Sequence, residues 1–128
     1  MALRVAAAVA VAFGLLTIGE GGRVLFGSEA ARRAAGHYVP FVLWFNFLAG
    51  FGSVAAGVGL WIRRGWALAL AATIFAGTAL VFLAFGVHVM RGGAYETRTV
   101  AAMTIRTAVW LAICATGWRF WGVRARAA

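Results

Sequence analysis

The amino-acid sequence predicts an all-α integral membrane protein, a four-helix bundle that runs up-down-up-down through the bilayer. Of the 128 residues, 64% are apolar and 12% are charged, and the mean hydropathy is +0.92. A soluble domain of this length could not hide so much apolar surface from water. We therefore expect a single transmembrane domain over residues 1–128 whose outer surface faces lipid.

Four apolar runs predict the membrane-spanning helices, because each approaches the length of about 20 residues that a helix needs to cross the hydrocarbon core. Their expected bounds are 2–19, 40–62, 66–90 and 97–119. Pro40 suits the first turn of the second helix, where its missing N–H costs nothing. The second and third helices are separated only by residues 63–65, so they form an antiparallel hairpin. The glycine pairs 21–22 and 92–93 are expected to let the chain leave the first and third helices.

A short interfacial helix is predicted between the first two spans. Ser28 is a favourable N-cap, Glu29 follows in the first turn, Arg32 and Arg33 lie in the last turn, and Gly36 is a favourable stop. These charges complement the helix dipole. We expect this segment to lie on the membrane surface.

The distribution of arginine predicts the orientation. One side of the predicted bundle carries six arginines and no acid, at positions 4, 63, 64, 119, 124 and 126. The other side carries five arginines and all three glutamates, at positions 23, 32, 33, 91 and 98 and at positions 20, 29 and 96. Positive residues favour the cytoplasmic side, so both termini are predicted to lie in the cytoplasm. Arginines at span borders are explained by this bias and by contact with membrane lipids, so no nucleic-acid partner is expected.

Polar residues gather on the side opposite the termini and predict a ligand-binding pocket there. The candidate residues are Glu20, Asn46, His88, Tyr95, Glu96, Arg98 and Arg106. Arg106 lies about two turns inside its span, where a lipid-facing charge is costly, so it should point into the bundle. Glu20 or Glu96 is its expected partner, with Glu20 favoured because Glu96 lies too far along the same helix. A purely structural network of these three residues is the alternative.

The histidines raise the question of a metal. His88 with Glu96 offers nitrogen and oxygen ligands suited to zinc, and His37 lies on the same side. The alternative is an interfacial histidine bound to a backbone carbonyl. No cofactor is identified, and the sequence holds no phosphate-binding loop and no cysteine pair. The lone Cys114 is expected to be a packing thiol.

Small residues predict where helices approach closely. Ala49, Ser53 and Gly57 recur at intervals of four, which places them on one helix face. This face is either a seam within the bundle or the interface of a homodimer or of a larger membrane complex.

Two stretches carry a resemblance to known proteins. Residues 88–103 (HVMRGGAYETRTVAAM) and residues 39–51 (VPFVLWFNFLAGF) resemble a family of small, uncharacterised bacterial inner-membrane proteins of four helices. The resemblance covers about the last two thirds of the chain, and it implies that His88, Tyr95, Glu96 and Arg98 belong to one recurring element. In size and topology alone, the chain is also similar to the DoxX-like four-helix proteins. Neither resemblance implies an activity.

Three functions remain open at this point. The first is binding of a small ligand, a metal ion or a quinone-like molecule in the polar pocket. The second is a non-catalytic accessory or assembly subunit of a larger membrane complex. The third is a small transporter or channel, which ranks last because the middle of the spans offers no acidic residue.

Overall fold

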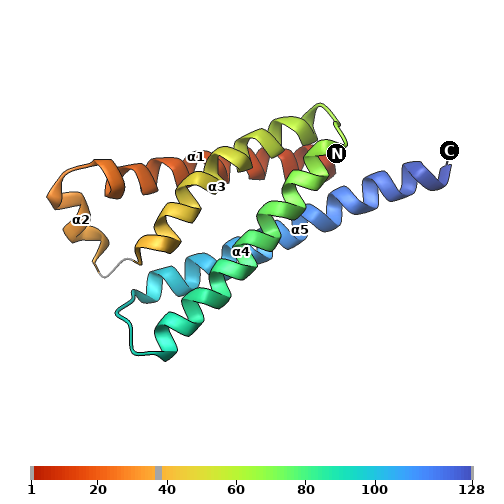
Figure 1. The fold of residues 1–128 in the computed structure, drawn as a ribbon. Coiled ribbons are helices and arrows are strands. Elements are labelled where there is room, and N and C mark those ends of the chain that lie inside the picture. Colours follow the sequence, from red (N-terminus) through yellow and green to blue (C-terminus); the bar gives the residue numbers. More distant parts are fainter. Residues whose placement is uncertain (1, 37–38, 128) are drawn as a thin grey trace.

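The computed structural model describes residues 2–36 and 39–127, and within these ranges it contains five α-helices and no strand (Figure 1). The helices are α1 (Ala2–Phe26), α2 (Glu29–Ala35), α3 (Pro40–Trp61), α4 (Trp66–Met90) and α5 (Thr97–Ala127). The predicted all-α four-helix bundle with one short extra helix is confirmed. The four long helices are long and apolar enough to cross a membrane, which is the architecture of a multi-pass membrane protein.

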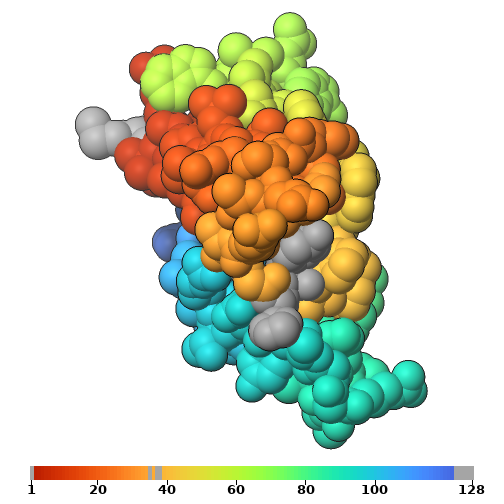
Figure 2. Space-filling view, turned by 90° about the vertical axis from the view of Figure 1, so that its left-hand side faces the viewer, coloured from red at the N-terminus to blue at the C-terminus, as the bar shows by residue number. Residues whose placement is uncertain are grey.

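The long helices run alternately in opposite directions (Figure 1). The start of α1, the end of α5 and the α3–α4 turn lie at one end of the bundle, which we call the terminal end. The helix α2 and the α4–α5 turn lie at the opposite end, which we call the α2 end. Figure 2 looks onto the α2 end, where α2 lies beside the first turn of α5. There the Arg98 side chain donates a hydrogen bond of 3.1 Å to the carbonyl of Ala34.

The first helix is longer than expected. It continues through the glycine pair to Phe26, whereas the sequence predicted an end at residue 19. Gly21 is buried against α3, and a Cβ atom there would lie 3.1 Å from the Cβ of Phe47. The glycine therefore permits close helix packing instead of ending the helix. The last helix also extends beyond its predicted end at residue 119, to Ala127.

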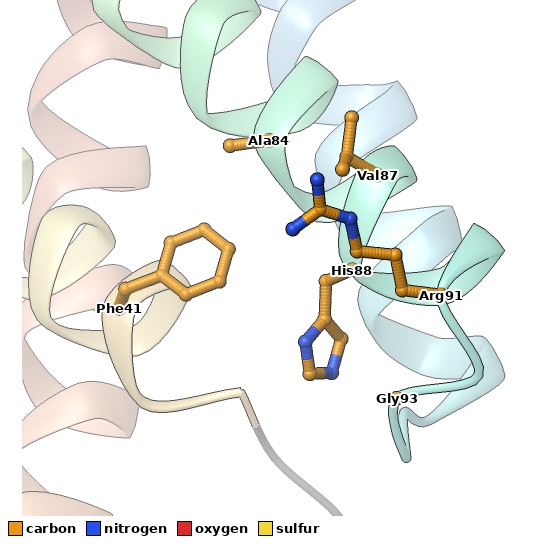
Figure 3. A pocket seen from close by; sticks show the side chains of 6 residues that line it. All are labelled: Phe41, Ala84, Val87, His88, Arg91 and Gly93. Atoms are coloured by element: carbon orange, nitrogen blue, oxygen red, sulfur yellow. The ribbon is translucent and has the colours of Figure 1, made fainter.

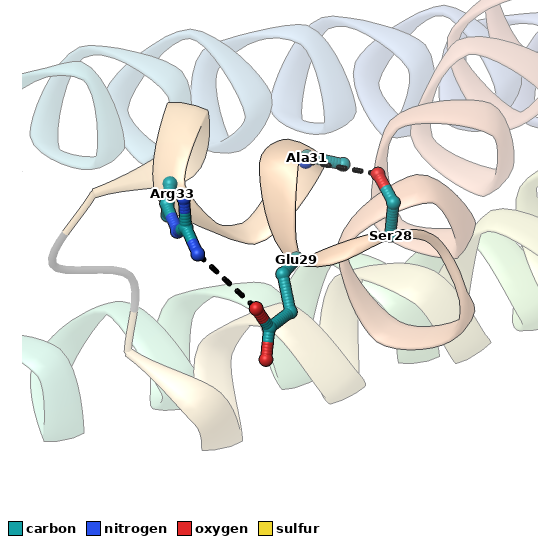
Figure 4. Close-up of polar contacts among 4 residues, drawn as sticks. All are labelled: Ser28, Glu29, Ala31 and Arg33. Carbon is teal, nitrogen blue, oxygen red and sulfur yellow. Dashed lines mark hydrogen bonds and ion pairs between the residues drawn. The ribbon is translucent and has the colours of Figure 1, made fainter.

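The short helix α2 forms as the sequence predicts (Figure 4). The Ser28 hydroxyl accepts a hydrogen bond of 3.3 Å from the Ala31 N–H, and Glu29 pairs with Arg33 at 3.2 Å. Gly36 follows the helix with a φ of +70°, a conformation that favours glycine.

Two tight turns connect the remaining helices. In the α3–α4 turn, Arg63 has a φ of +60°, and its guanidinium lies 5.7 Å from the centre of the Phe120 ring. In the α4–α5 turn, Gly92 has a φ of +79°, so the predicted role of the second glycine pair in ending a helix is confirmed. The N–H of Gly93 donates to the carbonyl of His88 at 3.0 Å, which closes the end of α4.

The buried apolar residues form two clusters that differ in the helices they join. At the terminal end, all four long helices contribute to one cluster, which contains Leu3, Ala6, Ala7, Ala10, Ala56, Leu60, Ala67, Ala71, Ile74, Trp110 and Ile113. Toward the α2 end, a smaller cluster contains Val39, Val42, Phe85 and Met103. None of its four residues comes from α1. The bundle is therefore closed by four helices at the terminal end and by three at the α2 end.

The small residues of α3 form a seam with α1. A Cβ atom on Gly57 would lie 2.8 Å from the Ala7 carbonyl oxygen, and one on Gly14 would lie 2.7 Å from the Gly50 carbonyl oxygen. Ser53 is buried in this seam, whereas Ala49 is only half-buried. The predicted close approach is thus made within the chain, which is the first of the two alternatives drawn from the sequence.

Candidate functional site

A cleft opens between α1 and α5 toward the α2 end, and α3 forms its floor. It consists of two adjoining cavities of about 330 and 240 Å³, which share the lining residues Glu20, Val24, Leu43, Asn46 and Ala102. The deeper cavity is also lined by Phe13, Leu16, Thr17, Gly21 and Arg106. The other is also lined by Val39, Val42, Glu96, Arg98 and Thr99. We call both together the α1–α5 cleft.

The cleft follows from the packing described above. Helix α1 stays against α3 along the glycine seam, while α5 is held to α3 and α4 by the cluster around Met103. Because α1 is absent from that cluster, no apolar cluster fills the space between α1 and α5 there, and the polar pair Thr17 and Arg106 joins the two helices instead. Five of the seven predicted site residues line the resulting cleft: Glu20, Asn46, Glu96, Arg98 and Arg106.

Arg106 is the most deeply placed charge of the cleft. It lies in the tenth position of α5, about 14 Å from the start of the helix, and is only 9% exposed. Its Nη1 donates a hydrogen bond of 3.0 Å to the Thr17 hydroxyl, and its guanidinium lies 5.0 Å from the centre of the Phe13 ring. Its Nε is buried without a hydrogen-bond partner.

These contacts correct one prediction. Arg106 points into the bundle as expected, but its partner is Thr17 of α1 and not a carboxylate. The reason is that Glu20 lies one turn nearer the α2 end, where its side chain is 75% exposed and pairs with Arg23 at 3.5 Å. A carboxylate at the membrane surface keeps its hydration in this way, whereas burial beside Arg106 would remove it.

Asn46 is the second polar residue in the interior of the cleft. Its Nδ2 donates to the sulfur of Met103 at 3.6 Å, and thioether sulfur is only a weak acceptor. Its Oδ1 is buried without a partner. An amide and a guanidinium that both line one cavity and both hold unpaired buried atoms are unusual, since most buried polar atoms in proteins are hydrogen-bonded.

Glu96 and Arg98 lie at the mouth of the cleft beside α2. A Cβ atom on Gly36 would collide with the carboxylate of Glu96, so this carboxylate lies beside the end of α2, and Arg98 binds the same end through the Ala34 carbonyl. These two residues therefore tie α2 to the first turn of α5, so that α2 borders the mouth of the cleft.

His88 lies outside the cleft, in a groove of about 550 Å³ between the start of α3 and the end of α4 (Figure 3). Its Nε2 lies 3.0 Å from the carbonyl oxygen of Ala94, and its ring stacks on Phe85. Figure 3 shows the ring turned toward the α4–α5 turn, while the Arg91 side chain reaches back toward Phe41. The prediction that placed His88 in one pocket with Glu20 is wrong, because α3 and α4 carry it to another face.

The remaining predicted ligands do not form a metal site among the described residues. Tyr95 is exposed and packs edge-on against Phe85, outside the cleft. Within residues 2–36 and 39–127, no group of three or more His, Cys, Asp or Glu side chains could hold a metal ion. The proposed pair of His88 and Glu96 therefore lacks a third ligand among these described residues, and the geometry supports the carbonyl-bound histidine. His37 lies outside the described residues.

Two residues of the cleft were missed at the sequence level. Thr17 and Phe13 supply the contacts of Arg106, and Thr17 also donates a hydrogen bond of 2.7 Å to the Phe13 carbonyl. The available signal was the position of Thr17, a polar residue inside an apolar span and three residues before Glu20.

Comparisons with known proteins identify no relative of this chain. No protein-family model, no curated protein sequence and no solved structure matches this chain. The resemblance to small four-helix membrane proteins stays a prediction.

Proposed function

We propose that this chain is a bacterial inner-membrane protein that binds a small amphipathic molecule, taken up from the bilayer, in the α1–α5 cleft. The observation that carries the proposal is the combination of apolar walls with the two interior residues Arg106 and Asn46, which hold buried polar atoms without partners. Ligand sites typically combine mostly apolar walls with a few polar groups that fix orientation.

The position of the cleft supports uptake from lipid. Its walls include Leu16, which is 67% exposed on the outer surface of α1, so the cleft borders the lipid-facing surface. A molecule with an apolar chain and a polar head can place the head at Arg106 and leave the rest of the chain among lipid chains. With both termini in the cytoplasm, as the arginine distribution predicts, the cleft lies in the periplasmic half of the membrane.

The accessory-subunit alternative has less support. It needs a free surface of small residues for a partner helix, and Ser53 and Gly57 are covered by α1. The small-transporter alternative needs polar groups along a path through the bundle. Near mid-span, the hydroxyls of Ser53 and Thr73 instead bind carbonyls of their own helices.

Photochemical labelling tests the proposal. The protein in phosphatidylcholine nanodiscs is irradiated with two amphiphiles that carry a photoreactive chain, a palmitic acid and a hexadecanol, and the labelled residues are mapped by mass spectrometry. We expect at least one probe to label residues of the cleft, and an excess of the same amphiphile without the photoreactive group should compete.

A matched pair of variants makes this test specific. Ala102 lines both cavities, so Ala102→Phe should fill the cleft and abolish the labelling. Its neighbour Ala101 is also exposed but lines neither cavity, so Ala101→Phe should leave the labelling unchanged. Labelling that is spread over all lipid-facing residues and insensitive to Ala102→Phe would overturn the proposal.

A further inference from the structure

We propose that the molecule bound in the α1–α5 cleft carries an anionic head group, a carboxylate or a phosphate, and that this group binds to Arg106. The inference rests on the proposed function and names the class of ligand for the same cleft. It excludes neutral quinones and cationic amphiphiles as the preferred ligands.

The first argument is the charge of Arg106. A guanidinium stays protonated in proteins, and at 9% exposure inside a membrane span it has lost nearly all of its hydration. Among the described residues, Arg23 pairs with Glu20 and Arg33 with Glu29, and Arg106 forms no ion pair with any described residue. The hydroxyl of Thr17 accepts one hydrogen bond but supplies no negative charge. An anionic head group in the cavity would supply the missing negative charge and could accept hydrogen bonds from the guanidinium.

The second argument is the surroundings of the guanidinium. Phe13, Leu16 and Leu43 line the same cavity. An apolar chain attached to the bound head group would therefore lie against an apolar wall. A small water-soluble anion would lose its hydration without any gain from that wall. The site therefore fits an anion that is attached to an apolar chain.

The third argument concerns Glu20, the one carboxylate that lines the deeper cavity. A carboxylate turned toward Arg106 would repel an anionic ligand. The side chain of Glu20 is instead 75% exposed and held by Arg23 at 3.5 Å. Asn46 lies in the lining of both cavities, and its Nδ2, which donates one N–H to the Met103 sulfur, has a second N–H for an anionic oxygen. A ligand that enters the cleft therefore meets a cation, the Arg106 guanidinium, and a neutral amide, that of Asn46.

Competition within a matched set of amphiphiles tests the inference. Labelling of the cleft by photoreactive palmitic acid or hexadecanol is competed with palmitate, hexadecyl phosphate, methyl palmitate, hexadecylamine and a neutral quinone with an alkyl tail. We expect palmitate or hexadecyl phosphate to compete at least about tenfold better than methyl palmitate, which is about 1.4 kcal/mol of binding free energy. The relative strength of these two distinguishes a fatty-acid carboxylate from a lipid phosphate, and inorganic phosphate alone should not compete.

Charge variants connect the preference to Arg106. Arg106→Gln should reduce the preference for the anion to within about twofold, and Arg106→Lys should retain part of it because the charge is kept. Arg64→Gln in the distant α3–α4 turn removes the same charge from a chain of net charge +9, so it controls for general attraction of anions and should change nothing. If Arg106→Gln fails to fold, Thr17→Val removes the Arg106 hydrogen bond without removing charge, and it should keep the full preference.

The outcomes separate the inference from the proposed function. Equal competition by methyl palmitate, stronger competition by the quinone, or an anion preference that survives in Arg106→Gln would overturn the anionic class while the cleft remains a binding site. Loss of the preference in Thr17→Val would overturn it as well. If no probe labels the cleft of the unaltered protein, the proposed function itself fails.

Discussion

The two halves of this bundle differ in how many helices pack into their apolar clusters. At the terminal end, alanines and a fully buried Trp110 let four helices meet in one apolar cluster. Toward the α2 end, three helices meet in the apolar cluster around Phe85 and Met103, and α1 contacts α5 there through the polar pair Thr17 and Arg106. The polar residues of the cleft lie in this second half. The comparison shows that the closed half holds the fold together, so the open half can carry polar groups that weaken packing.

The largest expected effect concerns topology, that is, which side of the membrane each end of the bundle faces. The two ends of the bundle must lie on opposite sides of the membrane. In a Cys114→Ala background, Ala30→Cys in α2 should react with a membrane-impermeant maleimide added outside intact cells. Gly65→Cys, where a Cβ atom meets open space, should react only after permeabilisation. Equal labelling of both from one side would refute the four-span arrangement.

The next effect concerns the seam that holds α1 on α3. Gly57→Leu should lower the free energy of unfolding in mixed micelles by about 2 to 3 kcal/mol, because the new side chain would collide with the Ala7 carbonyl and with Val11. Gly86→Leu is the control, since a Cβ atom there meets nothing within 4 Å. It should leave stability unchanged or raise it slightly. Equal losses in both variants would show that the seam has no special role.

Arg106 gives a smaller effect on stability and distinguishes a binding residue from a structural one. Arg106→Met removes a buried charge that has a single hydrogen-bond partner, so the free energy of unfolding should stay within about 1 kcal/mol or rise. Binding of the anionic amphiphile should fall at least about tenfold in the same variant. If Arg106 served mainly to lock the helices, stability would instead drop by about 3 to 5 kcal/mol.

The smallest effect is expected at His88, outside the cleft. His88→Ala removes the contact of Nε2 with the Ala94 carbonyl, so stability should fall by about 1 kcal/mol or less. Labelling of the α1–α5 cleft should not change. Loss of labelling in His88→Ala would restore the single pocket that the sequence predicted and would contradict the division into two faces.

The parts of this structure that could be predicted depend on local chemistry. The spans follow from apolar runs, and the cap of α2 follows from Ser28 and Gly36. The inward direction of Arg106 follows from the cost of a charge in lipid. Each of these rests on one segment and its surroundings.

The parts that could not be predicted depend on how helices face one another. Gly21 continues its helix because Phe47 packs against it, and that contact is absent from the local sequence. Likewise, Arg106 donates its hydrogen bond to Thr17 and not to Glu20, because α1 and α5 are in contact at the level of Thr17. The separation of His88 from the cleft reflects the rotation of α4, which an apolar run of uniform composition does not define.

The strained backbone at Arg63 in the α3–α4 turn is connected with the predicted insertion of the chain into the membrane. Arg63 holds a φ of +60°, where a residue with a Cβ atom is strained by about 1 kcal/mol and glycine is not. Glycine would relax the backbone, but it would remove one of the six arginines that predict the cytoplasmic side and also the contact with Phe120. Arg63→Gly should therefore yield a protein whose turn is more relaxed and whose population inserts less uniformly. On this prediction, the strained backbone at Arg63 is the cost of keeping an arginine that favours uniform membrane insertion.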